Sequence, residues 1–183
     1  MDLVDRLFAG RELRKRIADN RDRLFRVALA WCGDRMMADD LVQETLMISL
    51  QRVNQLRDKE RLNAWMYIIL SNCWKQHLRR MRPTVDIDEV GIVSGSDAES
   101  DCSEQEIVDR VRAAIVKLPV GQRQTLTLVD LAGFSYAEVA DVLSIPMGTV
   151  MSRLYSARQS LQKTLVDIHA SAPAHPAYLR RVK

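Results

Sequence analysis

The sequence predicts an all-α protein in which two small helical domains are joined by a flexible acidic linker. Apolar residues recur at intervals of three and four through two long blocks, and no run alternates as a strand does. The segment between the blocks lacks this period and is rich in Asp, Ser and Gly. We therefore place the first domain at 1–82, the linker at 83–103, the second domain at 104–168 and a flexible tail at 169–183.

Three amphipathic helices account for the first block, over about 11–32, 35–54 and 61–81. Gly33 is a suitable stop for the first helix, Asp34 is a suitable N-cap for the second, and Pro83 ends the third. The residues expected to be buried are Val42, Leu46, Leu50 and Val53 on the second helix, and Leu62, Trp65, Met66, Ile69 and Cys73 on the third. Such a trio can close a small core.

Four helices account for the second block, over about 104–118, 120–132, 135–143 and 147–168. Ser103 and Glu106 have the spacing of a capping box at the start of this block. Leu118-Pro119 and Gly133 interrupt the helical pattern, as helix ends do.

The net charge of +3 hides a strong segregation along the chain. Residues 1–82 carry 17 Lys and Arg against 11 Asp and Glu, whereas residues 83–106 carry 8 acidic residues and no basic one. Residues 107–183 return to 10 basic against 5 acidic residues. Two basic blocks around an acidic segment indicate two modules that face a polyanion.

The remaining composition predicts a cytoplasmic protein without membrane insertion. No apolar run approaches the roughly 20 residues that a membrane helix needs. The N-terminus mixes charges of both signs and does not resemble a secretory signal. Cys32, Cys73 and Cys102 are an odd set with wide spacing, which is typical of reduced thiols rather than of a disulfide framework.

The segment 135–161 has the pattern of a helix-turn-helix. Ala140 supplies the small residue where the two helices touch, and Val150, Leu154, Ala157 and Leu161 form one face of the second helix. The opposite face presents short polar side chains and arginines that could read base edges in a major groove. The free amides near 147–149 suit a phosphate. A helical hairpin that only packs is the alternative, and the Arg-bearing outer face argues against it.

Residues 118–161 resemble region 4 of the extracytoplasmic-function (group 4) sigma factors of the sigma-70 family. The resemblance rests on the Leu118-Pro119 break, the Gln122-Arg123 pair, the Gly133–Tyr136 start and the run PMGTVMSRL from Pro146. It implies recognition of the −35 promoter element by Met147, Gly148, Thr149, Ser152, Arg153, Ser156 and Arg158.

Two residues depart from that family pattern. Ser144 stands where relatives usually have Gly in the turn, so a left-handed backbone there would cost energy. Met151 stands where relatives often have Lys or Arg, which removes one expected phosphate or base contact.

The second helix of the first block carries acidic and amide groups beside a Met. Asp40, Gln43, Glu44 and Met47 share a face opposite the apolar stripe, which suits a basic protein partner better than DNA. An ordinary solvated face fits the same period equally well. The run DDLVQET from Asp39 resembles the family's region 2 signature, which implies docking on core RNA polymerase, at the beta-prime clamp helices, by Asp39, Asp40, Gln43, Glu44 and Met47.

The third helix and the loop before it resemble the family's promoter-melting segment. The resemblance implies −10 DNA contacts from Asn54, Gln55, Arg57, Asn72, Lys75, Arg79 and Arg80. The cationic residues would hold backbone phosphates, and the loop residues would help to capture a flipped base. Ile68 and Ser71 stand where relatives often have Arg. We expect Trp65 in the core rather than stacked on a base.

The resemblance implies an alternative sigma factor that is not an enzyme. Its expected partners are core RNA polymerase (including the beta flap), promoter DNA and an anti-sigma factor, and no cofactor is expected. The alternative is a sigma mimic that sequesters an anti-sigma factor without binding DNA; the retained Arg79, Arg80, Arg153 and Arg158 favour the sigma factor. An ordinary helix-turn-helix regulator would not need the DDLVQET helix. Cys73 and His77 are spaced to chelate a metal, but two ligands are too few for a structural zinc site, so neither a metal site nor a metal enzyme is expected.

Overall fold

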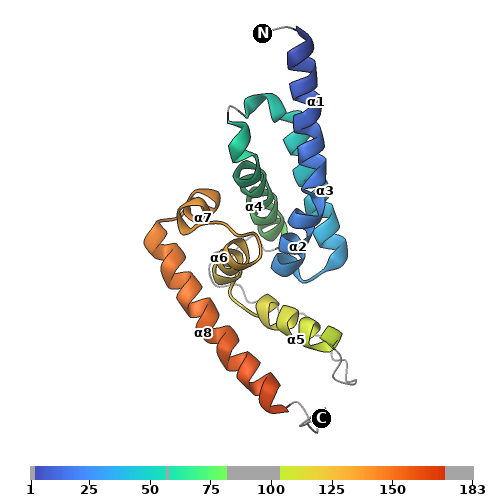
Figure 1. Ribbon diagram of the computed structural model, residues 1–183. Coiled ribbons are helices and arrows are strands. Elements are labelled where there is room, and N and C mark those ends of the chain that lie inside the picture. The colour runs from blue at the N-terminus through green and yellow to red at the C-terminus, as the bar shows by residue number, and fades with distance from the viewer. Residues whose placement is uncertain (1–2, 57, 82–103, 172–183) are drawn as a thin grey trace, which may run out of the picture.

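The computed structural model describes residues 3–56, 58–81 and 104–171. Predictions for Ser103, Arg57, the linker and residues 172–183 lie outside this part of the chain. The described residues form eight α-helices and two short 3-10 turns, without a strand, which confirms the all-α prediction (Figure 1).

The first helical unit comprises four α-helices and the two 3-10 turns. These are α1 (Leu3–Asp19), α2 (Arg21–Cys32), α3 (Arg35–Gln51), the turns Val53–Gln55 and Lys59–Arg61, and α4 (Leu62–Met81). The prediction of one helix over 11–32 is wrong, because the chain breaks at Asn20. The side-chain Nδ2 of Asn20 donates a hydrogen bond to the carbonyl of Arg16 at 2.8 Å, and such local bonds compete with the helical ladder.

Local capping signals define α2 and α3. Gly33 adopts a left-handed conformation with φ of 72° and donates its N–H to the Leu29 carbonyl, which ends α2. The Asp34 carboxylate accepts a hydrogen bond of 2.7 Å from the backbone N–H of Met37 and so caps α3. Both predictions at this boundary are confirmed.

The buried face of α3 differs from the predicted stripe. Val42 is buried and Leu46 is partly buried, but Leu50 is 41% exposed, and Val53 is buried from the turn that follows the helix. The inward face includes Thr45 and Ser49, whose hydroxyls donate to carbonyls one turn back at 2.7 Å. Polar residues that satisfy themselves in this way can be buried, and a purely apolar pattern overlooks them.

The predicted inner side of α4 is largely confirmed. Leu62, Met66, Ile69 and Cys73 are buried, and Trp65 packs partly buried against the core. Trp74, whose environment the sequence left open, is also buried and stacks on His77 with ring centroids 5.9 Å apart.

The second helical unit contains the remaining four helices. These are α5 (Glu104–Val116), α6 (Val120–Asp130), α7 (Tyr136–Leu143) and α8 (Met147–Ser171). The predicted element order is confirmed, and α8 continues three residues past 168.

The two units pack against each other over a continuous core. In Figure 1, α6 and α7 lie beside α2 and α4, with α8 on the outer side. Val120, Leu128 and Val142 of the second unit belong to the same buried cluster as Leu24 and Leu70 of the first. A smaller cluster, formed by Leu118, Leu126, Leu154 and Ala157, joins α6 to α8 within the second unit. The sequence pattern did not predict this contact between the units.

Candidate nucleic-acid interface

The turn between α7 and α8 sets the geometry of the helix-turn-helix. Ser144 adopts φ of 58° and ψ of 49°, and it is the one non-glycine residue with positive φ among those described. A left-handed L-residue costs about 1–2 kcal/mol, which the flanking helices must offset. Ser144 therefore adopts the left-handed backbone conformation that was expected to cost energy, and the tight turn forms despite that cost.

A capping box begins α7. The Ser135 backbone N–H donates to the Glu138 carboxylate at 2.8 Å, and the Ser135 hydroxyl accepts from the Glu138 N–H at 3.3 Å. The Ser135 hydroxyl also donates to that carboxylate at 2.7 Å, and this hydrogen bond, followed by the one from the Ser135 backbone N–H, lowers the pKa of Glu138. Ser followed by Glu three residues later is a recognisable start signal, so this helix start could have been predicted from the sequence.

The two faces of α8 are arranged as its period predicts. Val150, Leu154 and Ala157 are buried, and Leu161 is partly buried. On the other side, Met147 is 50% exposed, Gly148 and Ser152 are exposed, and Thr149 and Ser156 are partly exposed. A Cβ added at Gly148 would meet nothing within 4 Å, so the start of the helix is open to a ligand.

The two arginines predicted to contact DNA from α8 make contacts within the protein. The Arg158 guanidinium forms an ion pair with Asp130 at 2.8 Å. Arg153 is half-buried, and its guanidinium lies against α6, where a Cβ added at Gly121 would come within 2.8 Å of Cζ. A side chain at position 121 would therefore require the Arg153 guanidinium to shift from this position.

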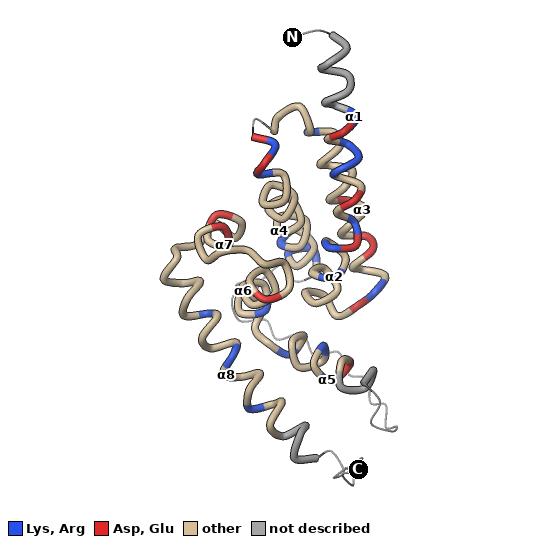
Figure 2. The backbone as a smooth tube through the Cα atoms, in the orientation of Figure 1, with Lys and Arg blue, Asp and Glu red and all other residues tan. Residues whose placement is uncertain are grey.

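The residues of α4 expected to contact the −10 element fall into two groups. Asn72, Arg79 and Arg80 are exposed, and Figure 2 shows basic positions at this end of α4 and along α8. Lys75 is half-buried, and its Nζ donates to the carbonyl of Leu143 at 3.3 Å. Burial, followed by the charges of Arg79 and Arg153, lowers the pKa of Lys75.

The loop residues Asn54 and Gln55 are exposed in the turn that follows α3. They are therefore accessible to a base, whereas Arg57 lies outside the described residues. The loop reaches α4 through a second turn, whose N-terminus is capped by a hydrogen bond of 3.0 Å from the Glu60 N–H to Asp58.

The acidic face of α3 is open to a partner. Asp40 and Gln43 are exposed, Met47 is 55% exposed, and Glu44 is partly exposed. Asp39 differs from the others because it accepts a hydrogen bond of 2.7 Å from Arg21 on α2. Four of the five predicted docking residues thus share an accessible face, and the fifth is tied to the neighbouring helix.

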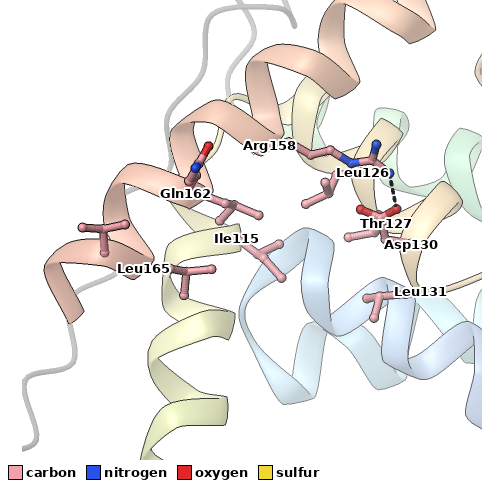
Figure 3. A pocket seen from close by; sticks show the side chains of 10 residues that line it. Ile115, Leu126, Thr127, Asp130, Leu131, Arg158, Gln162 and Leu165 are labelled. Carbon is pink, nitrogen blue, oxygen red and sulfur yellow. Dashed lines mark hydrogen bonds and ion pairs between the residues drawn. The ribbon is translucent and has the colours of Figure 1, made fainter. Parts of the chain in front are cut away.

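An apolar groove between α5, α6 and α8 was not predicted from the sequence. It has a volume of about 570 Å³, and the Arg158–Asp130 ion pair lies at its edge (Figure 3). Its apolar lining residues are Ile115, Leu126, Leu131, Leu161, Leu165 and Val166. Such a groove suits the apolar face of an amphipathic helix. The continuation of the apolar face of α8 past Leu161 to Leu165 was an available sequence signal.

The described residues contain no group of three or more His, Cys, Asp or Glu side chains that could hold a metal ion. Cys73 of the Cys73–His77 pair is buried, and burial raises the pKa of its thiol. Within the same part of the chain, no helix is long and apolar enough to span a bilayer.

Comparison with known proteins assigns both helical units. Residues 17–84 match the family model of Sigma-70 region 2, and residues 109–161 match Sigma-70, region 4. The ECF RNA polymerase sigma factor EcfG of Rhodopseudomonas palustris is 34% identical over 143 residues, which are 78% of each chain. The RNA polymerase sigma-H factor of Pseudomonas aeruginosa is 31% identical over 144 residues, 72% of this chain and 75% of that one.

Among solved structures, the sigma factor RpoE of Bartonella quintana, in complex with the anti-sigma factor NepR, superposes with a TM-score of 0.71. The match covers 85% of this chain and 97% of that chain at 25% identity.

Proposed function

The chain belongs to the extracytoplasmic-function sigma factors of the sigma-70 family, and from this premise we propose how its two helical units divide the work of transcription initiation. The unit of α1–α4 docks on core RNA polymerase and opens the −10 element. The unit of α5–α8 recognises the −35 element. As an alternative sigma factor the chain directs transcription, and the polymerase supplies the catalytic residues.

The observation that carries the proposal is the pairing of two different surfaces on one chain. The face of α3 with Asp40, Gln43 and Glu44 is acidic and accessible, which suits a basic protein surface and would repel phosphate. The outer face of α8 follows a tight turn and carries short polar side chains, which suits a major groove. A DNA-binding regulator that acts without polymerase has no need of the first surface.

The assignment of DNA contacts follows from chemistry and position. Thr149, Ser152, Arg153 and Ser156 reach base edges, while the amides at Met147 and Gly148 hold a phosphate at the helix start. Arg79 and Arg80 at the end of α4 hold phosphates of the −10 region, which contributes affinity that depends on salt and carries no sequence information. Asn54 and Gln55 help to capture a flipped base.

The partners proposed for this chain follow from the same surfaces. The α3 face docks on the beta-prime clamp helices, and the apolar groove between α5, α6 and α8 receives an apolar helix face of the beta flap. An anti-sigma factor holds the chain inactive, as the complex of RpoE with NepR illustrates for a relative. The site of action is the cytoplasm. None of the findings favours the decoy alternative, since the matched relatives are named as sigma factors.

Run-off transcription with purified core polymerase on a promoter library tests the proposal. We expect transcripts that depend on the chain. Glu44→Lys should weaken core binding, because it places a cation on the acidic face, while Glu12→Lys makes the same charge change on an exposed position of α1 and should leave core binding intact. Absence of chain-dependent transcripts, with Glu44→Lys behaving as Glu12→Lys does, would contradict the proposal.

Two arginine variants distinguish base reading from phosphate binding. Arg153→Ala should relax the preference for the −35 sequence, at a cost of about 1–3 kcal/mol on the best sites. Arg79→Ala should weaken binding to all sequences similarly and reduce the salt dependence of log K by about one unit. Arg112→Ala, which removes an exposed arginine of α5 paired with Asp109, serves as the control.

A further inference from the structure

An apolar strip crosses the outer face of α8. Its members are Met147, Met151 and Tyr155, which are 50%, 48% and 66% exposed. They recur at intervals of four positions, so each is the surface neighbour of the next along the helix. Single exposed apolar side chains are common on proteins, whereas three in a row form a continuous surface that a ligand could cover.

The strip lies beside the polar side chains that are proposed to read the −35 element. Ser152 directly follows Met151 and Ser156 directly follows Tyr155, and successive residues are turned by about 100° around a helix. Ser152 is exposed and Ser156 is partly exposed, on the side of α8 that does not pack on the core. A helix that places this side in a major groove therefore brings the strip and the serines to the base edges together.

The charges of α8 favour DNA as the occupant of the strip. Residues 147–166 contain three basic side chains, Arg153, Arg158 and Lys163, and no Asp or Glu. Figure 2 shows basic positions along this helix. A cationic frame around an apolar strip complements a polyanion. The strip also belongs to the unit that is proposed to recognise the −35 element, so it is continuous with that surface.

Thymine is the base whose chemistry fits an apolar side chain in the major groove. Guanine, adenine and cytosine present hydrogen-bonding groups there, whereas thymine adds a C5-methyl group. Met151 and Tyr155 are separated by about 6 Å along the helix axis, at about 1.5 Å per residue. That separation exceeds the spacing of about 3.4 Å between stacked base pairs, so the two side chains meet different base pairs of one site.

A hydrogen bond orders the ring of Tyr155 before any ligand is bound. The Gln159 Nε2 donates to the Tyr155 hydroxyl at 2.9 Å, one turn further along α8. Ordering a side chain in advance lowers the entropy that is lost on association. The strip therefore presents a preorganised apolar surface at Tyr155 and an adaptable one at Met151, because a Met side chain has three rotatable bonds.

We propose that Met151 and Tyr155 determine promoter specificity by covering the C5-methyl groups of thymines in the −35 element. The inference rests on the proposed function and deepens it, because it names the base that this side of α8 selects. It also gives a role to Met151, which stands where relatives often have Lys or Arg: an ionic contact is exchanged for an apolar one. The −35 element of this chain accordingly contains A·T pairs opposite the two side chains.

Removal of single methyl groups from the DNA tests the proposal. Promoters selected from the library by the holoenzyme of core polymerase and the wild-type chain are remade with deoxyuridine at each −35 thymidine in turn. Deoxyuridine keeps the base pairing and lacks only the C5-methyl group. Burial of one methyl group contributes about fourfold to affinity, so competition binding should show about fourfold weaker binding at one or two of these positions.

Variants of the strip assign the effect to its side chains. Met151→Ala and Tyr155→Ala should each bring the ratio of thymine to uracil affinity close to one at its own position, and Ala favours the helix, so α8 should stay folded. Tyr155→Phe keeps the ring and should keep the fourfold ratio. Val108→Ala, which shortens an exposed apolar side chain of α5, serves as the matched control and should leave every ratio unchanged.

Three results would overturn the proposal while the proposed function stands. The first is equal affinity of the wild-type holoenzyme for the thymine and uracil promoters. The second is a loss that persists undiminished in both Ala variants, because it would then come from the DNA itself. The third is a set of selected −35 elements without an A·T pair. A holoenzyme that selects no upstream element would instead overturn the proposed function, and the inference with it.

Discussion

Replacement of Thr127 by Val should weaken the joint between the two helical units. Thr127 is fully buried, and its Oγ1 accepts the Trp31 indole N–H at 2.6 Å while donating to the Arg123 carbonyl at 2.8 Å. Val fills nearly the same volume but accepts no hydrogen bond. The indole N–H would then be buried without a partner, which costs about 1–3 kcal/mol.

Thr125 provides a matched control on the same helix. It is also fully buried, and its Oγ1 donates to the Gly121 carbonyl at 2.8 Å, but among the described residues no hydrogen bond joins its side chain to the first unit. Thr125→Val therefore removes the same kind of bond within α6, and we expect it to cost less than about 1 kcal/mol, because that carbonyl can keep its backbone partner. The difference between the two variants isolates the bond between the units.

Urea unfolding followed by circular dichroism and by tryptophan fluorescence measures this difference. For a chain of this size, 1 kcal/mol corresponds to about 2–4 °C in Tm, so thermal melts should separate the variants as well. Equal loss of stability in Thr127→Val and Thr125→Val would refute the reasoning, because it would mean that the Trp31 bond contributes nothing to the folded chain.

Three further predictions concern single positions. Asp34→Ala should lower the free energy of unfolding by about 0.5–2 kcal/mol, measured by urea titration, because the Met37 N–H loses its 2.7 Å cap. Ser144→Gly should raise Tm, with a gain of about 0.5–1 kcal/mol, since relief of the left-handed backbone outweighs the added freedom of the unfolded chain; an unchanged or lower Tm would count against strain at this turn. In the free chain, burial raises the pKa of Cys32 from 9.0 to about 11, so its thiolate should be about 100-fold scarcer near neutral pH than that of an ordinary thiol, and alkylation should accelerate as the pH approaches 11. Labelling of Cys32 at the rate of a model thiol at pH 8 would disprove the burial effect.

The parts of the fold that the sequence predicts are those determined by local signals. Asp34 caps α3 through its own side chain, and Gly33 ends α2 through its own backbone freedom. The inner face of α8 follows from the helical spacing of its apolar residues, and Val150, Leu154 and Ala157 are buried as that spacing predicts. In each case the residues that determine the feature lie within four or five positions of one another, so the sequence alone can predict it.

The errors arise where polar residues take positions inside an apolar pattern. Asn20 interrupts an amphipathic stretch because its side chain bonds to the backbone of Arg16, and the period alone continues through it. Leu50 is exposed because the inward face of α3 is completed by Thr45 and Ser49, whose hydroxyls are satisfied by their own helix.

The contact between the two units could not be predicted because it is non-local. Arg123 is a charged residue that the helical pattern would place in solvent, and it is buried because it donates hydrogen bonds to the carbonyl of the distant Trp31 and to that of Leu118. Arg153 lies on the polar face of α8, as predicted, yet the absence of a side chain at Gly121 lets its guanidinium lie against α6. The helix period placed Ser152 on the exposed face of α8, as the structure has it, whereas the half-buried position of Arg153 could be learned only from the structure. The DNA contacts of these residues stay predictions.

Hydroxyl-radical footprinting of the complex of core polymerase, this chain and a promoter selected from the library measures the central claim directly. Two separate helical units on one polymerase should protect two stretches of DNA whose centres lie about 25 base pairs apart, with protection of the upstream stretch weakened by Arg153→Ala. A single protected stretch, or none, while the chain remains bound to the polymerase, would contradict the account.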